Sequence, residues 1–69
     1  MGHKNISIKN VSNADNHFIV VGENFTKFSY VMVNGEYVDT IYSSDEALLV
    51  DGITLKEGDS VAVVQKGKD

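Results

Sequence analysis

The sequence predicts an all-β protein, a sandwich of about six to seven short strands. Apolar residues come in short runs with a period of two, and no stretch of a dozen residues keeps the 3.6-residue period of an amphipathic helix. Clusters rich in Gly, Asn, Asp and Ser separate the runs, which is typical of the turns between sheet strands. Short strands in regular succession with such turns indicate a sandwich or a barrel.

We expect six strands and no long helix. The pattern places the strands at residues 6–8, 18–21, 30–33, 37–42, 47–50 and 60–65. The polar clusters at 13–16 and 56–59 have the composition of turns. Asn34-Gly35, between the third and fourth expected strands, is the strongest two-residue signal for a hairpin.

This hairpin determines which residues share a face of the sheet. A two-residue loop pairs Met32 with Tyr37 and Val31 with Val38, and paired residues point to the same side. Both faces are apolar, which is more than a one-sided sheet requires. We expect the valine face to be the core, because β-branched residues fill a sandwich interior well and tyrosines keep a hydroxyl for water. The valine face consists of Val31, Val33 and Val38, and the opposite face of Tyr30, Met32, Tyr37 and Ile41.

Size limits what can hold this fold together. The chain has 69 residues, enough for one domain, and a chain this small buries only about 60% of its unfolded surface. It contains no Cys, and its two histidines, His3 and His17, are far apart with no metal-ligand spacing around them. We therefore expect the β core alone to stabilise the domain. Residues 1–3 are interpreted as a cloning remnant and residues 4–69 as a single domain.

Charge and hydropathy exclude several classes of partner. Six Lys plus Arg against ten Asp plus Glu give a formal net charge of -4, which would repel a phosphate backbone, so nucleic acid is not expected as a partner. The sequence has no run of 18 apolar residues, and its opening residues are not followed by the apolar segment that a signal peptide needs. We expect neither membrane insertion nor a signal peptide in this segment.

Residues 18–26 resemble a known family of domains. The second strand of IPT/TIG immunoglobulin-like (E-set) domains runs into a Gly-x-Asn-Phe turn, which here corresponds to Gly22-Glu23-Asn24-Phe25. Downstream, residues 30–35 resemble the family's third strand with its Asn-Gly turn, residues 44–48 the entry into its fifth strand, and residues 55–63 the Gly-led strand that follows. The resemblance extends from Ile6 to Val64, although each motif is short.

The resemblance implies an immunoglobulin-like β-sandwich whose final strand is missing after residues 66–69. It implies structural roles at one turn: Gly22 where a Cβ would be awkward, Asn24 bonding to nearby backbone, and Phe25 filling the end of the core. The inward positions that it implies agree with the hairpin register. They are Phe18, Val20, Phe25, Val31, Val33, Val38, Leu48, Val50, Val61 and Val63.

The resemblance also implies a setting. Domains of this kind occur in bacterial surface proteins, in sulfatase-like or carbohydrate-active enzymes, and in receptors and transcription factors, usually as spacers, dimer contacts or binding modules. We expect an accessory or protein-interaction domain of a larger bacterial protein, on the cell surface or anchored to the membrane, and located on the extracellular side. Its partners would be other domains of the parent protein or a separate protein.

No pattern of catalytic residues is present, and we expect the chain not to be an enzyme. Its loop carboxylates could supply oxygen ligands to calcium, but they lack the spacing of a cation loop and are interpreted as solvated turn formers. His17 has no nucleophile patterned near it. We expect no metal site and no cofactor. The loop carboxylates are Asp45, Glu46, Asp51, Glu57 and Asp59.

One group of residues predicts a contact surface. Clustered aromatic and Met side chains on a sheet face are typical of a surface that binds a protein partner. Three alternatives stay open: stacking of the tyrosines on a carbohydrate, simple packing under a neighbouring strand or under Phe28, and a spacer that binds nothing. The sugar-binding alternative predicts exposed, roughly coplanar tyrosine rings, and the spacer predicts that both rings are covered. The predicted surface consists of Tyr30, Met32, Tyr37 and Ile41.

The strand expected at residues 60–65 raises a second question of contact. If a following strand normally pairs with it, the strand is an exposed edge in this chain. Its apolar segment Val61-Ala62-Val63-Val64 would then favour pairing with a second copy of the chain, as a homodimer, or with a strand from elsewhere. The alternative is that residues 6–8 cover the edge within the same chain. Charge in the tail after residue 65 would also blunt it.

Overall fold

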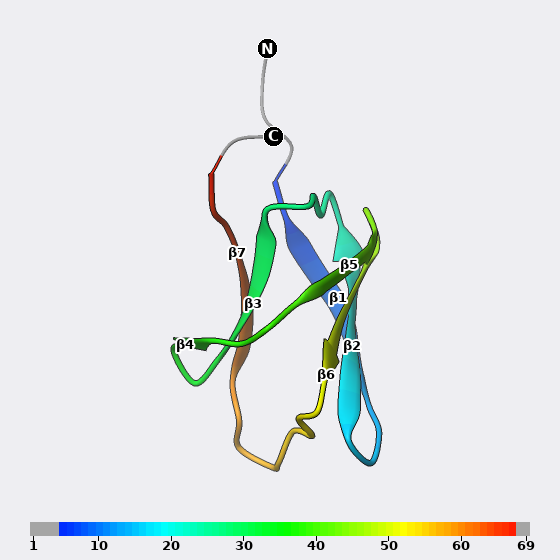
Figure 1. The fold of residues 1–69 in the computed structure, drawn as a ribbon, viewed down its shortest axis with the longest axis vertical. Coiled ribbons are helices and arrows are strands. Elements are labelled where there is room, and N and C mark those ends of the chain that lie inside the picture. The colour runs from blue at the N-terminus through cyan, green and yellow to red at the C-terminus, as the bar shows by residue number, and fades with distance from the viewer. Residues whose placement is uncertain (1–4, 68–69) are drawn as a thin grey trace.

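A computed structural model describes residues 5–67, which form two antiparallel sheets (Figure 1). The interpretation of residues 1–3 as a cloning remnant lies outside the described residues. Residues 5–67 contain no helix, and so none with the length and hydrophobicity that a bilayer crossing would need. The strands are β1 (Ser7–Asn13), β2 (His17–Glu23), β3 (Ser29–Val33), β4 (Glu36–Tyr37), β5 (Ile41–Ser44), β6 (Ala47–Asp51) and β7 (Val61–Gln65).

The expected all-β sandwich is confirmed. One sheet has the strand order β1-β2-β6-β5 and the other the order β4-β3-β7. These orders correspond to A-B-E-D and C′-C-F of an immunoglobulin sandwich, in which a further strand G would lie beside F. Within residues 5–67, no strand pairs with the far side of β7.

The core lies between the two sheets and contains every residue expected there. Phe18, Val20, Phe25, Val31, Leu48 and Val50 are buried, and Val33, Val38, Val61 and Val63 pack against them while partly exposed. Buried and partly exposed residues alternate along β2 and β6, because these strands occupy the middle of their sheet and only one of their faces meets the core. Sequence analysis missed four further residues that pack on the core, namely Ile6, Val11, Ile53 and Leu55.

The turn after β2 has the structure that the resemblance implied. A Cβ at Gly22 would collide with the backbone oxygen of Ser7 and would lie 2.7 Å from Cζ of Phe25. Asn24 has a φ of 68° and its Nδ2 donates a hydrogen bond to the carbonyl oxygen of Asn5 at 2.6 Å. Phe25 is only 2% exposed. The turn therefore holds Asn5 against the end of β2.

The two-residue hairpin at Asn34-Gly35 is confirmed, and so is its register through β4. Asn34 has a φ of 54° and Gly35 a φ of 85°, as a two-residue type I′ loop requires. The loop pairs Met32 with Tyr37, as expected. Beyond β4, the N–H of Val38 still donates to the carbonyl oxygen of Val31 at 3.0 Å.

The prediction of one continuous strand over residues 37–42 is wrong. β4 ends at Tyr37, and the chain crosses to the other sheet, where β5 pairs with β6. The hydroxyl of Thr40 explains where the ladder stops: it accepts a hydrogen bond from the Val31 N–H at 2.9 Å and donates one to the Val38 carbonyl at 3.0 Å. It thus occupies the position at which these two backbone groups would otherwise bond to each other.

The first strand is longer than expected. The sequence indicated residues 6–8, whereas β1 extends from Ser7 to Asn13 and pairs with β2 along its length. A bulge between Ile8 and Asn10 shifts its register, so that alternation along the sequence is interrupted. Most residues of β1 are exposed, which is why its pattern reads as polar.

Candidate functional site

Three of the four predicted contact residues lie together on the side of the three-stranded sheet that faces away from the core. Val31 is fully buried, so its neighbours Tyr30 and Met32 on β3 point outward. Tyr37 pairs with Met32 and therefore shares this side. We call the surface formed by Tyr30, Met32 and Tyr37 the outer face. Its existence follows from the hairpin register that the sequence predicted.

The assignment of Ile41 to this surface is wrong. Ile41 lies in β5, where it pairs with Leu49 of β6 in the four-stranded sheet, and it is 50% exposed there. Counting by twos from Tyr37 assumes one unbroken strand, but the chain changes sheets between β4 and β5. A period-two pattern carries no information about such a crossing.

Lys66 adds a cation to the outer face. Its N–H donates to the carbonyl oxygen of Phe28 at 2.8 Å, which continues the β3–β7 ladder by one residue past β7. The Nζ atom lies 4.5 Å from the centre of the Tyr37 ring and 5.7 Å from the centre of the Tyr30 ring. Contacts of this kind are worth about 0.5–1 kcal/mol when exposed. Lys66 therefore ties both rings to the end of β7.

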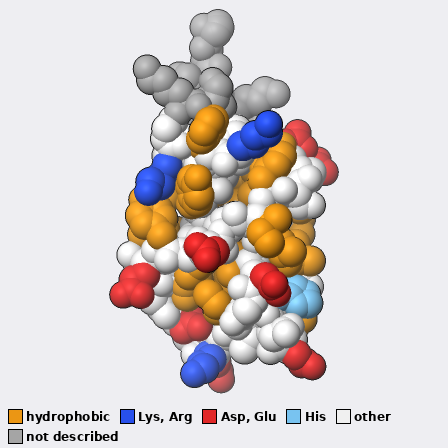
Figure 2. All heavy atoms as spheres, viewed as in Figure 1, with side chains coloured by type: hydrophobic (Ala, Val, Ile, Leu, Met, Phe, Trp, Pro, Cys, Tyr) orange, Lys and Arg blue, Asp and Glu red, His pale blue; other side chains and the backbone are white. Residues whose placement is uncertain are grey.

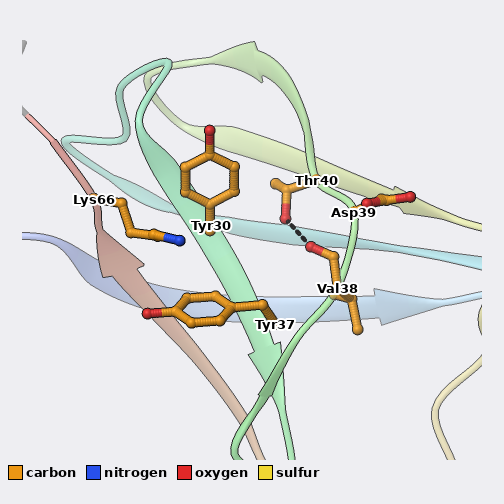
Figure 3. Close-up of a pocket in the computed structure, with 6 residues that line it drawn as sticks. All are labelled: Tyr30, Tyr37, Val38, Asp39, Thr40 and Lys66. Atoms are coloured by element: carbon orange, nitrogen blue, oxygen red, sulfur yellow. Dashed lines mark hydrogen bonds between the residues drawn. The ribbon is translucent and has the colours of Figure 1, made fainter.

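The chain between β4 and β5 turns the outer face into an open notch. Figure 3 shows the side chain of Lys66 directed between Tyr30 and Tyr37, while Asp39 points away from the two rings. The notch has a volume of about 400 Å³. It is lined by two phenol rings, one cation, one carboxylate and the hydroxyl of Thr40. Its lining consists of Tyr30, Tyr37, Val38, Asp39, Thr40 and Lys66.

Exposure on the outer face is uneven. Tyr37 is 53% exposed, whereas Tyr30 and Met32 are partly buried. The two rings do not share a plane in Figure 3, so they do not form the flat platform that stacking on a sugar would favour. In Figure 2, hydrophobic side chains on the visible side of the molecule are separated by charged ones. The outer face thus combines a half-exposed aromatic ring with the polar side chains of Lys66, Asp39 and Thr40 that line the notch.

Sequence reasoning missed Lys66, Asp39 and Thr40 as parts of this site. Lys66 follows the last expected strand, and only the register between β3 and β7 brings it beside the tyrosines. Asp39 and Thr40 fall within the single strand that the sequence predicts at residues 37–42. Nothing in local spacing would have found them, since both positions depend on the crossing from β4 to β5.

The loop carboxylates do not gather. Among residues 5–67, no three His, Cys, Asp or Glu residues lie close enough to hold a metal ion. The backbone carbonyls of Asp45 and Glu46 accept hydrogen bonds at 2.9 Å from the N–H groups of Phe25 and Gly22, so this loop contributes to the turn after β2. Nδ1 of His17 lies 3.4 Å from Oδ1 of Asn16 at the tip of the β1–β2 hairpin.

Asp59 belongs to a hydrogen-bonded turn before β7. Its carboxylate accepts hydrogen bonds from Nδ2 of Asn34 at 3.0 Å and from the N–H of Lys56 at 2.9 Å. The bond from Asn34, followed by that from Lys56, lowers the pKa of Asp59 below its ordinary value. These bonds tie the β3–β4 hairpin to the start of β7.

Comparison with known proteins finds no matching family model, no similar curated protein and no similar solved structure. The resemblance to IPT/TIG domains therefore stays a prediction that rests on the short motifs quoted above. The class that the coordinates define is a small antiparallel β-sandwich with an outward aromatic notch.

Proposed function

We propose that this domain is a non-catalytic protein-interaction module and that its outer face is the surface that contacts the partner. The observation that carries this proposal is the 53% exposure of Tyr37 on a sheet face that the sandwich does not use for its core. A small sandwich needs only one apolar face on each sheet. An apolar second face with an exposed aromatic ring is therefore available to a partner.

The chemistry of the outer face suits a protein partner. Tyrosine and methionine are enriched at the centres of protein interfaces, where aromatic anchors supply most of the binding free energy. Lys66, within 4.5 Å of the Tyr37 ring centre, limits the freedom of that ring before binding. A ring that is already held loses less conformational entropy on association. Asp39 at the margin of the notch would belong to the polar rim.

The proposed setting is a larger bacterial protein of the cell surface or anchored to the membrane, with this domain on the extracellular side as an accessory unit. It is supported by the resemblance to IPT/TIG motifs and by the positions of Gly22, Asn24 and Phe25, which occupy the roles that the resemblance implied. The partner would then be a neighbouring domain of the parent protein or a separate protein.

The test is a titration of the isotope-labelled chain with the neighbouring domains encoded by the parent gene, produced separately and followed by NMR. We expect amide shifts at Tyr30, Met32, Tyr37 and Lys66, and a loss of about 2 kcal/mol of binding free energy in Tyr37→Ser. Tyr42→Ser is the matched control, because Tyr42 is a 40% exposed tyrosine on β5 of the other sheet. Equal losses in both variants, or shifts confined to the other sheet, would contradict the proposal.

Carbohydrate binding is a second candidate that one observation favours. The notch of about 400 Å³ combines aromatic rings with Lys66 and Asp39, whose charged groups would bond to sugar hydroxyls. The planes of the rings differ in Figure 3, which is why we place a protein partner first. Titration with a panel of soluble glycans distinguishes the two, since saturable shifts at Tyr37 that Tyr37→Ser abolishes would favour the sugar. An absence of shifts in both titrations would favour a spacer domain that binds neither a protein nor a sugar.

A further inference from the structure

β7 is an edge strand whose outward backbone groups can be identified. The Lys66 N–H donates to the carbonyl of Phe28, and the Asn34 N–H donates to the carbonyl of Ser60. The backbone N–H and C=O groups of even-numbered residues in and beside β7 therefore point toward β3. The N–H and C=O groups of its odd-numbered residues therefore point to the other side, where no strand within residues 5–67 pairs with them. These odd-numbered residues are Val61, Val63 and Gln65.

The other three edges of the two sheets are blunted, and β7 is not. β1 has a bulge after Ile8 and carries Lys9, which bridges to Glu23 at 2.9 Å. β4 is two residues long, and the register of β5 is irregular between Tyr42 and Ser44. By contrast, β7 is five residues long, uncharged, and pairs with β3 without a register shift. Bulges, charges and shortness are the means by which sheet edges avoid pairing.

The sandwich is also less well closed along this edge. Val61 and Val63 of β7 face the core but are only partly buried, whereas Val31, which pairs with Val63 on β3, is fully buried. Across the sandwich, β1 contacts β7, and Ile8 of β1 pairs with the inward Gly22 yet is 38% exposed. A strand added next to β7 would cover these apolar side chains as well as satisfy the free backbone groups.

We propose that the occupant is β7 of a second copy of this chain, paired antiparallel about a two-fold axis at Val63. In this register, Val63 faces its own counterpart and Val61 faces Gln65 of the other copy, with about six backbone hydrogen bonds between them. The turn before the uncharged strand carries two carboxylates, Glu57 and Asp59, against one cation, Lys56, and Lys66 follows the strand. Antiparallel pairing therefore brings the basic end of each copy to the acidic end of the other.

The resulting dimer is weak and forms reversibly. A single strand pair buries less surface than a stable interface of standard size, and each copy carries a net charge of -4, which opposes association. We therefore expect a dissociation constant roughly in the micromolar to millimolar range. Pairing of the β7 edges joins the three-stranded sheets of both copies into one, and it leaves Tyr37 free, so this proposal does not depend on the one above.

The test combines sedimentation equilibrium with amide exchange over a range of protein concentrations. We expect the average mass to rise from the monomer toward twice its value. Exchange of the Val61, Val63 and Gln65 amides should slow as the mass rises, while Ala62 and Val64, which bond to β3 in either state, stay unchanged. A chain that remains monomeric at the highest concentration would overturn the proposal. If the odd-numbered amides are slow at every concentration, the same chain covers the edge and the proposal is wrong.

Charge substitution tests the register itself. In the proposed pairing, Ala62 of one copy lies opposite Val64 of the other, on the outer side. Ala62→Lys with Val64→Lys, and separately Ala62→Glu with Val64→Glu, should each stay monomeric, whereas an equimolar mixture of the two doubly substituted chains should associate. Tyr42→Ser, at a 40% exposed residue on β5 of the other sheet, is the control that should dimerise like the original chain. Association that persists in either double variant alone, or that fails to return in the mixture, would assign the dimer to another surface.

Discussion

Asn34 connects parts of the chain that are distant in sequence. Its backbone forms the hairpin turn with a φ of 54°, its Oδ1 accepts from the N–H of Ser60 at 3.0 Å, and its Nδ2 donates to Asp59. Asparagine is suited to this position because it tolerates the left-handed conformation and its side chain bonds to neighbouring backbone. One residue thus sets the hairpin register and fastens the hairpin to the start of β7.

The carboxylate of Asp59 makes the stability of this turn depend on pH. Its pKa is lowered in the folded protein, because Asn34 and Lys56 donate hydrogen bonds to the charged form. The stabilisation is therefore complete above the pKa that Asp59 has in the unfolded chain, about 4. It is lost as the pH falls through the lower pKa that Asp59 has in the folded protein. We expect the unfolding midpoint of Asp59→Asn to lie below that of the original chain at pH 7, with the difference shrinking below about pH 4. A difference that stays constant from pH 7 to pH 3 would contradict this role.

Among the elements, the crossing between β4 and β5 depends on one hydroxyl. Thr40 accepts from the Val31 N–H and donates to the Val38 carbonyl, and both contacts are partly buried. Thr40→Val keeps the shape of the side chain but leaves both backbone groups without a partner, so we expect a loss of about 1–3 kcal/mol in the free energy of unfolding. Thr40→Ser is the control and should lose less than half as much. Equal losses would mean that the methyl group, not the hydroxyl, matters.

Local signals in the sequence predicted the parts of this fold that local chemistry decides. The Asn34-Gly35 turn led to the correct pairing of Met32 with Tyr37 and to the core positions Val31, Val33 and Val38. The ten inward positions that the resemblance implied all lie in the core or pack against it. The crossing at Thr40 was missed, because a hydroxyl that replaces one ladder bond leaves the alternation of residues unchanged. Lys66 was missed for a similar reason, since its place beside Tyr37 arises from a strand pairing between segments about thirty residues apart.

In the whole molecule, the two sides of the three-stranded sheet differ sharply in exposure. The inner side holds Val31 at 0% exposure, and Phe25 fills the end of the core at 2%. The outer side holds Tyr37 at 53%. Within residues 5–67, no buried side-chain nitrogen or oxygen lacks a hydrogen bond, so the inner side is fully satisfied without help from the outer face. We infer that folding does not need the outer tyrosine, which is therefore available for binding.

The free energies of unfolding of Tyr37→Ser and Phe25→Ala, measured in urea beside the original chain, test this claim most directly. We expect Tyr37→Ser to lose at most about 1 kcal/mol, which is the size of an exposed contact with Lys66. Phe25→Ala should lose about 3–5 kcal/mol, and Phe25→Leu gives a milder comparison should that loss approach the whole stability of so small a domain. A Tyr37→Ser variant as destabilised as Phe25→Ala would place the outer face in the core and contradict the proposed contact surface.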